Sequence, residues 1–163
     1  MNIRYKLIEQ ERFQDAPFTG ALVCAVGCDL NCPGCFNESV KQMPTSIQSA
    51  EGIVKSISDN PFNEGIILGG LEWSLQPDEL LELVKTALEQ DLKVMIYTGL
   101  PLEQFLDRVP RLVTVEGEIY IKHGAYDSSL SHVQPVMYGV KLASENQRID
   151  KLKTVQTQFF SQI

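Results

Sequence analysis

Basic residues are scarce in this sequence and do not cluster. Its 163 residues include 14 lysines and arginines against 21 aspartates and glutamates, which gives a formal net charge of −7. Binding to nucleic acid through a general basic surface needs clustered Lys and Arg side chains to contact the phosphates. The composition therefore argues against a nucleic-acid-binding protein of that kind.

Long apolar runs are also missing. No stretch approaches the ~18 consecutive apolar residues that indicate a membrane span. The start of the chain, Met1 to Lys6, leads into polar residues rather than into the apolar core of a signal peptide. We therefore expect a soluble, cytoplasmic protein.

Internal repeats, low-complexity tracts and linkers are absent from the sequence, so residues 1–163 are expected to form one domain. With 44% apolar residues, the chain can bury a hydrophobic core. It is too short for a complete eight-unit (βα) barrel, which needs ~250 residues. Any barrel in this protein would be incomplete.

Cysteines are few and concentrated. All four lie between Cys24 and Cys35, so disulfides would fasten only one small loop and leave the rest of the chain unlinked. In a reducing compartment, such a group of cysteines indicates metal or redox chemistry more often than disulfide bonding.

The order of the apolar segments predicts an α/β fold. Three short apolar runs, at 21–26, 66–68 and 93–97, are typical of strands that are buried on both faces. A helical pattern follows each run, and this alternation predicts a parallel sheet with right-handed crossovers and helices that cover it. Weaker patterns follow at residues 112–115 and 119–121 (short strands) and 144–163 (a polar segment with a final helix).

The expected helices begin at identifiable residues. Thr45 or Ser46 can cap the first helix, whose apolar face would begin at Ile47. Pro77, which is followed by two acidic residues, opens the second helix, and Pro101 opens the third. The loops after the three strands would then meet at the carboxyl ends of the strands, where parallel α/β folds bind ligands.

The stretch Gly27-Cys28-Asp29-Leu30-Asn31-Cys32-Pro33-Gly34-Cys35-Phe36-Asn37 follows the first predicted strand and carries the spacing C-x-x-x-C-x-x-C. Thiolates are the preferred ligands of iron-sulfur clusters and of structural zinc. Closed zinc sites and ordinary clusters take four protein ligands, whereas this loop offers three. Three thiolates on a four-iron cluster would leave one iron open to a small molecule; a degenerate zinc site or a loop of free thiols is the alternative.

Cys24 is the remaining candidate for a fourth ligand. In an extended strand, the four residues from Cys24 to Cys28 span roughly 13 Å at ~3.3 Å per residue. Both sulfurs could reach one small centre only through a sharp bend at Gly27. We therefore expect Cys24 to be a buried strand cysteine, since free cysteine is among the most buried residue types.

With these residues in view, the sequence resembles the radical S-adenosylmethionine enzymes, and Cys32 to Asn37 is similar in particular to the activating proteins of anaerobic (class III) ribonucleotide reductases. Gly70-Leu71-Glu72 stands at the place of the family's Gly-Gly-Glu motif, with Leu71 in place of the second glycine. An alternative register uses Gly69-Gly70 and a one-residue insertion. Tyr97-Thr98-Gly99 and the segment 144–148 resemble two further family motifs, so that the likeness covers roughly residues 20 to 148.

The resemblance implies an incomplete (βα) barrel in which Cys28, Cys32 and Cys35 hold a 4Fe-4S cluster. S-adenosyl-L-methionine would bind the fourth iron and be cleaved reductively to a 5'-deoxyadenosyl radical. By resemblance, this radical would generate a glycyl radical on the large subunit of the anaerobic ribonucleotide reductase, with an electron donor such as a flavodoxin. The residues implied to contact the cofactor are Gly34, Cys35, Phe36, Asn37, Gly69, Gly70, Glu72 and Thr98.

Two other functions remain open from the sequence. The chain could activate another glycyl-radical enzyme, or it could be a non-enzymatic iron-sulfur or zinc protein. Glu72 could bind the cofactor's amino group or serve only as a favourable charge near a helix N-terminus. Trp73, Tyr97 and Tyr126 are expected to be packing residues, although Trp73 could also contact a partner.

Some polar residues carry no clear role in the sequence. His123 and His132 lack ligand-like spacing with each other or with the cysteines, so ordinary hydrogen-bonding or surface roles are expected. Asn146 and Gln147 lie in the segment that resembles a family motif, but no role for them follows from the sequence. Arg148 could pair with a carboxylate.

Overall fold

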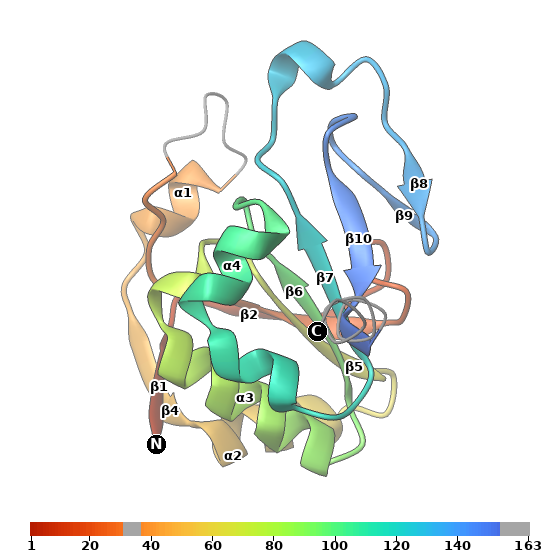
Figure 1. The fold of residues 1–163 in the computed structure, drawn as a ribbon. Helices are drawn as coiled ribbons and strands as arrows, with labels where there is room; N and C mark the ends of the chain where they lie inside the picture. The colour runs from red at the N-terminus through yellow and green to blue at the C-terminus, as the bar shows by residue number, and fades with distance from the viewer. Residues whose placement is uncertain (31–36, 154–163) are drawn as a thin grey trace.

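The computed structural model describes residues 1–30 and 37–153. At its centre lies a six-stranded sheet with the strand order β10-β7-β6-β5-β3-β2 (Figure 1). The four inner strands run parallel, and each edge strand runs antiparallel to its neighbour. The strands are β2 (Ile8–Arg12), β3 (Gly20–Cys24), β5 (Gly65–Gly69), β6 (Lys93–Tyr97), β7 (Ile119–His123) and β10 (Arg148–Lys151). The predicted α/β fold with a mostly parallel sheet is confirmed.

The parallel register brings the carboxyl ends of the inner strands level. Cys24 at the end of β3 pairs with Gly69 at the end of β5, and Tyr97 at the end of β6 pairs with Lys122 in β7. Strand β5 is buried along its whole length, as expected of an apolar strand that is covered on both faces. The loops after β3, β5, β6 and β7 therefore leave the sheet at the same edge.

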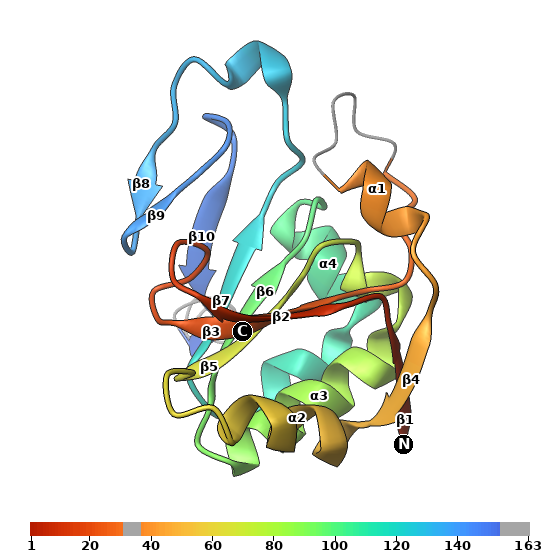
Figure 2. The same ribbon diagram turned by 180° about the vertical axis from the view of Figure 1, so that it is seen from behind.

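Three helices cover one face of the sheet: α2 (Ala50–Ser58), α3 (Pro77–Glu89) and α4 (Leu102–Arg108) (Figures 1 and 2). Helix α3 turns an apolar stripe inwards, and Leu80, Leu83, Val84 and Ala87 on this stripe are fully buried. Pro77 at its first turn, with two acidic residues beside it, favours the start of the helix. The second predicted helix and its start at Pro77 are therefore confirmed.

Loops rather than helices cover the opposite face. Phe18, from the connection between β2 and β3, packs there with Leu142 against side chains of the inner strands that include Ile67, Met95 and Tyr120. Leu142 follows a short hairpin formed by β8 (Val136–Met137) and β9 (Val140–Lys141). Both faces of the parallel strands are thus buried.

The remaining elements lie at the margins of the sheet. A two-stranded antiparallel sheet pairs β1 (Asn2–Tyr5) with β4 (Ser46–Ser49), and the short helix α1 (Glu38–Lys41) precedes β4. Three 3₁₀ helices complete the described chain: η1 (Trp73–Leu75), η2 (Pro110–Thr114) and η3 (Ser128–Leu130).

The predicted start of the first helix is wrong. Helix α2 begins at Ala50, and its N-cap is Ser49, whose hydroxyl accepts a hydrogen bond from the Gly52 amide at 3.0 Å. Ile47 lies in β4 and is 64% exposed, because pairing with β1 extends this segment before the helix can start. The apolar face of α2 therefore begins at Ala50.

The weaker predictions beyond residue 110 have mixed outcomes. The strand predicted at 119–121 is confirmed as part of β7, whereas the strand predicted at 112–115 is wrong because Pro110 opens η2 there. Residues 148–151 of the final polar segment form the edge strand β10, and its predicted final helix falls largely outside the described residues. Within the described ranges, no helix is long and apolar enough to cross a membrane.

Candidate functional site

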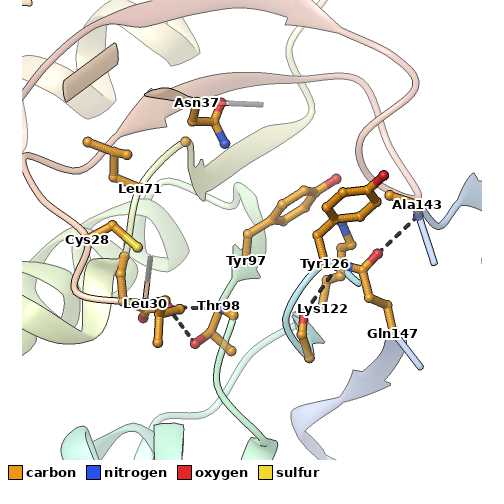
Figure 3. A pocket seen from close by; sticks show the side chains of 14 residues that line it. Cys28, Leu30, Asn37, Leu71, Tyr97, Thr98, Lys122, Tyr126, Ala143 and Gln147 are labelled. Carbon is orange, nitrogen blue, oxygen red and sulfur yellow. Dashed lines mark hydrogen bonds between the residues drawn. The ribbon is translucent and has the colours of Figure 1, made fainter. Parts of the chain in front are cut away.

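A pocket opens at the edge of the sheet where the inner strands end, and Figure 3 shows its lining. Four loops that follow parallel strands contribute to it. The residues from these loops are Cys28 and Leu30 after β3, Gly70, Leu71 and Glu72 after β5, Thr98 and Gly99 after β6, and Gly124 and Tyr126 after β7. The expected meeting of the loops at the carboxyl ends of the strands is confirmed.

The segment between β3 and Cys28 is fastened to the loop after β5. The Ala25 amide donates to the Gly69 carbonyl at 3.2 Å, and the Glu72 amide donates to the Gly27 carbonyl at 2.8 Å. In addition, the indole Nε1 of the fully buried Trp73 donates to the Val23 carbonyl at 3.1 Å. These bonds place Cys28 at the pocket and confirm the packing role of Trp73.

Gly70 is held against Cys24. Its φ is +79°, and a Cβ at this position would lie 2.2 Å from the Cys24 Sγ. Glycine is therefore needed here both for the backbone conformation and for the close approach. Cys24 itself is 2% exposed, and burial raises the pKa of its thiol to about 12. Its expected role as a buried strand cysteine is confirmed.

Glu72 is 2% exposed, and its carboxylate links two of the loops. Its Oε1 accepts hydrogen bonds from the Thr98 Oγ1 at 2.9 Å and from the Gly99 amide at 3.0 Å. Its Oε2 accepts from the Ser74 amide at 3.1 Å and so caps η1. Both carboxylate oxygens thus have partners in the protein, and the side chain also lines the pocket.

Tyr97 and Lys122 line the pocket from adjacent strands, and the sequence had not indicated Lys122 as a site residue. The Lys122 Nζ lies 4.4 Å from the centroid of the Tyr97 ring, in a cation–π arrangement. Burial lowers the pKa of Lys122, and the nearby Asp15 carboxylate opposes this effect. The Tyr97 hydroxyl donates to the Asp15 carbonyl, and burial raises the pKa of Tyr97. The sequence held one signal for the position of Lys122. It lies two residues after Tyr120 and therefore on the same face of β7 as Tyr120.

Gln147 fixes the loop after β7. It is 5% exposed, and its side chain accepts from the Ala143 amide at 3.0 Å and donates to the Gly124 carbonyl at 3.2 Å. Asn146 donates to the Ala125 carbonyl at 2.7 Å, and the Ser144 hydroxyl donates to the Asn146 Oδ1 at 2.7 Å. The segment 144–147 thus supports the far wall of the pocket. The sequence alone did not predict this role.

The other polar residues discussed above lie elsewhere. Arg148 is exposed in β10, and His132 is exposed as well. The His123 Nε2 lies 2.7 Å from the Asp150 Oδ2. This is the ordinary hydrogen-bonding role that was expected for His123. Arg108 of α4 reaches Asp29 at 3.3 Å, which adds a contact beside Cys28.

The predicted ligand set is only partly described. Cys32, Gly34, Cys35 and Phe36 lie outside the described residues. Of the other predicted residues, Cys28, Asn37, Gly70, Glu72 and Thr98 line the pocket, and Gly69 ends β5 beneath it. Among residues 1–30 and 37–153, no group of three or more His, Cys, Asp or Glu side chains could hold a metal ion. The Cys28 thiol in the pocket lining fits one ligand of an iron-sulfur cluster.

Fold and site together define an α/β protein with a cysteine-bearing pocket at the carboxyl edge of a parallel sheet. The model of one family, the 4Fe-4S single cluster domain, matches residues 19–150. The chain belongs to this family, which is found in radical S-adenosylmethionine-type proteins. No curated protein matches the chain.

Proposed function

We propose that the protein is a radical S-adenosylmethionine enzyme that activates a glycyl-radical enzyme. The observation that carries the proposal is that Cys28 shares one pocket with the loops after β5 and β6, which resemble the cofactor-binding loops of that superfamily. Cys28, Cys32 and Cys35 would hold the cluster. The six-stranded sheet would correspond to an incomplete (βα) barrel, and the pocket lies at the edge where such barrels bind ligands.

The cofactor would lie against residues from both ends of the cysteine loop and from the neighbouring strand ends. By resemblance, Gly34, Cys35, Phe36 and Asn37 would flank it on one side, and Gly69, Gly70, Glu72 and Thr98 on the other. When bound, the reduced cluster would supply the electron that cleaves S-adenosylmethionine into methionine and a 5'-deoxyadenosyl radical, which would take a hydrogen atom from a glycine of the partner.

The chain's own side chains would bind and orient the cofactor. Lys122 offers a positive charge in the pocket wall for a carboxylate. Glu72, whose oxygens already accept hydrogen bonds from Thr98, Gly99 and Ser74, would fix the relative positions of the loops after β5 and β6. Leu71, which is 7% exposed, would present an apolar wall where the family motif has glycine.

The identity of the partner rests on the resemblance of Cys32 to Asn37 to the activating proteins of anaerobic ribonucleotide reductases. The large subunit of that reductase would supply the glycine, and a donor such as a flavodoxin would supply the electron. Both are proposed on this likeness alone.

Anaerobic reconstitution with iron and sulfide, followed by chemical reduction in the presence of S-adenosylmethionine, tests the enzymatic proposal. We expect formation of 5'-deoxyadenosine. Stable zinc binding without cofactor cleavage would contradict the proposal. Adding the large reductase subunit then tests the partner: a glycyl radical signal supports it, whereas a signal only with another glycyl-radical enzyme would replace it.

A further inference from the structure

We propose that Gln76 is a positioning residue for the cluster-binding loop, and that Glu79 and Arg4 hold its side chain in place. None of these three is among the described residues that line the pocket. Their effect on the cluster would therefore pass through the backbone of the segment that leads to Cys28. The inference rests on the proposed role of Cys28 as a cluster ligand.

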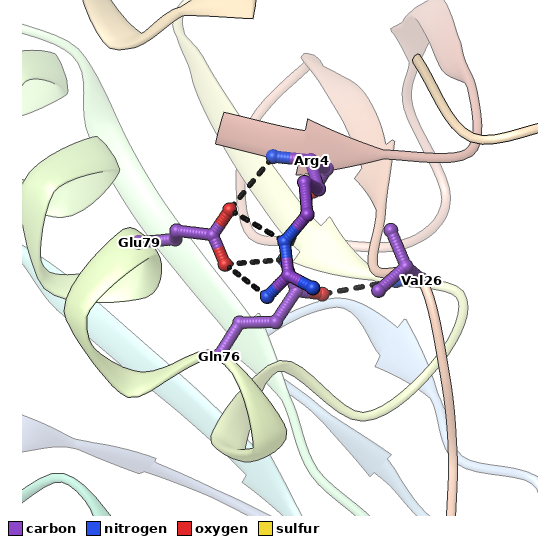
Figure 4. Close-up of polar contacts among 4 residues, drawn as sticks. All are labelled: Arg4, Val26, Gln76 and Glu79. Atoms are coloured by element: carbon purple, nitrogen blue, oxygen red, sulfur yellow. Dashed lines mark hydrogen bonds and ion pairs between the residues drawn. The ribbon is translucent and has the colours of Figure 1, made fainter. Parts of the chain in front are cut away.

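Gln76 connects three parts of the chain that are distant in sequence (Figure 4). Its Oε1 accepts a hydrogen bond from the Val26 amide at 3.0 Å, and its Nε2 donates to the Arg4 carbonyl at 2.9 Å and to the Glu79 Oε2 at 3.0 Å. Gln76 is 3% exposed, and all three bonds are partly buried. Removing the amide would leave partly buried polar groups without these partners, which is costlier than losing an exposed hydrogen bond.

Glu79 and Arg4 fix the orientation of the Gln76 amide. The Glu79 Oε1 accepts from the Arg4 backbone amide at 2.8 Å, and its Oε2 accepts from the Arg4 Nη2 at 2.8 Å. Burial alone would raise the pKa of Glu79, but the hydrogen bonds from Arg4 and Gln76 outweigh it and lower the pKa. Glu79 therefore stays ionised and can only accept hydrogen bonds, so the Gln76 nitrogen must point towards it and the Gln76 oxygen towards Val26.

The position of Val26 explains why this bond matters to the site. Ala25 before it and Gly27 after it are held by backbone partners at the end of β5 (Gly69) and in the loop that follows (Glu72). Val26 lies beyond the end of β3, and a side chain supplies the bond that a neighbouring strand would otherwise provide. Cys28 follows two residues later. The bond from Val26 to Gln76 therefore adds to the two backbone bonds that hold the chain immediately before the Cys28 thiol.

Two leucine variants separate this role from a general loss of stability. Gln76→Leu removes the three bonds described above. Asn63→Leu serves as the matched control, because Asn63 is 8% exposed and makes three hydrogen bonds, to the Glu11 amide, Gln10 and the Ile57 carbonyl, in a connection remote from the pocket. Both variants are expected to lower the denaturant midpoint by similar amounts, since each removes three hydrogen bonds of a buried amide side chain.

The first readout needs no cluster. In the iron-free protein, hydrogen exchange at the Val26 amide should accelerate by about tenfold in Gln76→Leu, because the amide loses its acceptor. In Asn63→Leu this amide should exchange at the wild-type rate. Equal exchange at Val26 in wild type and Gln76→Leu would overturn the proposal.

The second readout is the rate at which the reconstituted protein releases iron to a chelator in the absence of S-adenosylmethionine. Loss of a residue that orients a metal ligand typically weakens binding by about 10- to 100-fold. We expect release to accelerate by at least about tenfold in Gln76→Leu, less in Glu79→Gln, and not at all in Asn63→Leu. Equal release rates in Gln76→Leu and Asn63→Leu would overturn the positioning role.

These outcomes can be told apart from a failure of the proposed function. If wild-type protein holds the cluster but does not cleave the cofactor, the enzymatic proposal fails, and the iron-release comparison still decides the role of Gln76. If Gln76→Leu does not fold, Glu79→Gln keeps the test, because it removes the charge that orients the Gln76 amide while retaining a hydrogen-bonding side chain. In that case, iron release from Glu79→Gln at the wild-type rate would contradict the proposal.

Discussion

The two sides of the pocket are held in place by different means. On the cysteine-bearing side, the consecutive residues Ala25, Val26 and Gly27 are bonded to buried groups of the loop after β5 and of the segment that opens α3. Ala25 itself, with Leu71 and Trp73 next to these partners in sequence, belongs to the main core that α2 and α3 form with the sheet. This side is therefore continuous with the most buried part of the molecule.

The opposite side consists of residues 124–147, which extend away from the sheet before returning as β10 (Figures 1 and 2). Its two ends are joined by hydrogen bonds of the Ser144, Asn146 and Gln147 side chains to residues 124–127. Val140 and Leu142 pack against the sheet, whereas Val133 and Val136 are exposed. With Cys28 as the proposed cluster ligand, we expect cluster binding and pocket shape to depend on separate sets of contacts. Changes on the cysteine side should disturb the cluster, whereas changes on the opposite side should spare it.

The largest effect is expected from Cys28→Ala. Removing a cluster ligand should lower the iron content after reconstitution by at least about tenfold and abolish formation of 5'-deoxyadenosine. Cys24→Ala is the control, because Cys24 is buried beneath Gly70 and should not bind iron. Iron and sulfide analysis of the two proteins measures the difference, and equal iron loss in both would make Cys24 a ligand.

The next largest effect concerns Gly70, on the same side. Gly70→Ala should lower the free energy of unfolding by about 3 kcal/mol, because it combines a left-handed φ with a close approach to Cys24. Gly139→Ala is a matched control: Gly139 has the same φ of +79°, but no atom lies within 4 Å of a Cβ built there. Gly139→Ala should lower the free energy of unfolding by about 1 kcal/mol, because only the backbone conformation is unfavourable there. Urea unfolding measures both, and equal costs would exclude the steric contribution.

Gln147→Leu probes the opposite side. The loss of two partly buried hydrogen bonds should lower the free energy of unfolding by about 2 kcal/mol and slow cofactor cleavage, while the iron content stays at the wild-type level. Arg148→Gln, at the adjacent exposed position, should change stability by less than about 0.5 kcal/mol. A loss of iron in Gln147→Leu would show that the two sides are not independent.

The smallest effect is a pH dependence of stability at Lys122. Because burial lowers its pKa in the folded protein, the unfolded chain binds more protons between the folded pKa and the ordinary value of about 10.5, and stability contributed by this residue rises with pH in that window. The stability of wild type relative to Lys122→Met should therefore increase as the pH rises. Urea unfolding between about pH 7 and 9.5 measures this below the range in which tyrosines titrate; a relative stability that falls with pH would contradict the assignment.

Much of the fold could be predicted because its strands are apolar on both faces. The runs at 66–68 and 93–97 lie within β5 and β6, since an almost uninterrupted apolar segment has few other favourable environments. Strands that the sequence did not reveal, such as β1 and β2, carry mostly polar residues and lie at margins of the structure. Their pairing depends on tertiary neighbours rather than on their own pattern.

Some residues of the candidate site could also be predicted from the sequence, and others could not. Cys28, Gly70 and Thr98 could be predicted because each lies just after a strand and belongs to a short motif. Lys122 and Gln147 also line the pocket, yet their contribution depends on which strand lies next to which and on how residues 124–147 return to the sheet. Gln76 could not be predicted as a partner of Val26, because the two residues are 50 positions apart and meet only through tertiary packing, in which α3 contacts β1 and β6.

Electron paramagnetic resonance of the reduced, reconstituted protein, recorded with and without S-adenosylmethionine, tests the central claim most directly. A cluster held by three thiolates has one iron open to a ligand, so the spectrum should change when the cofactor is added to wild-type protein. The Cys24→Ala protein should give the same change. A reduced 4Fe-4S signal that S-adenosylmethionine leaves unaltered would contradict the claim that this pocket binds the cofactor at the cluster.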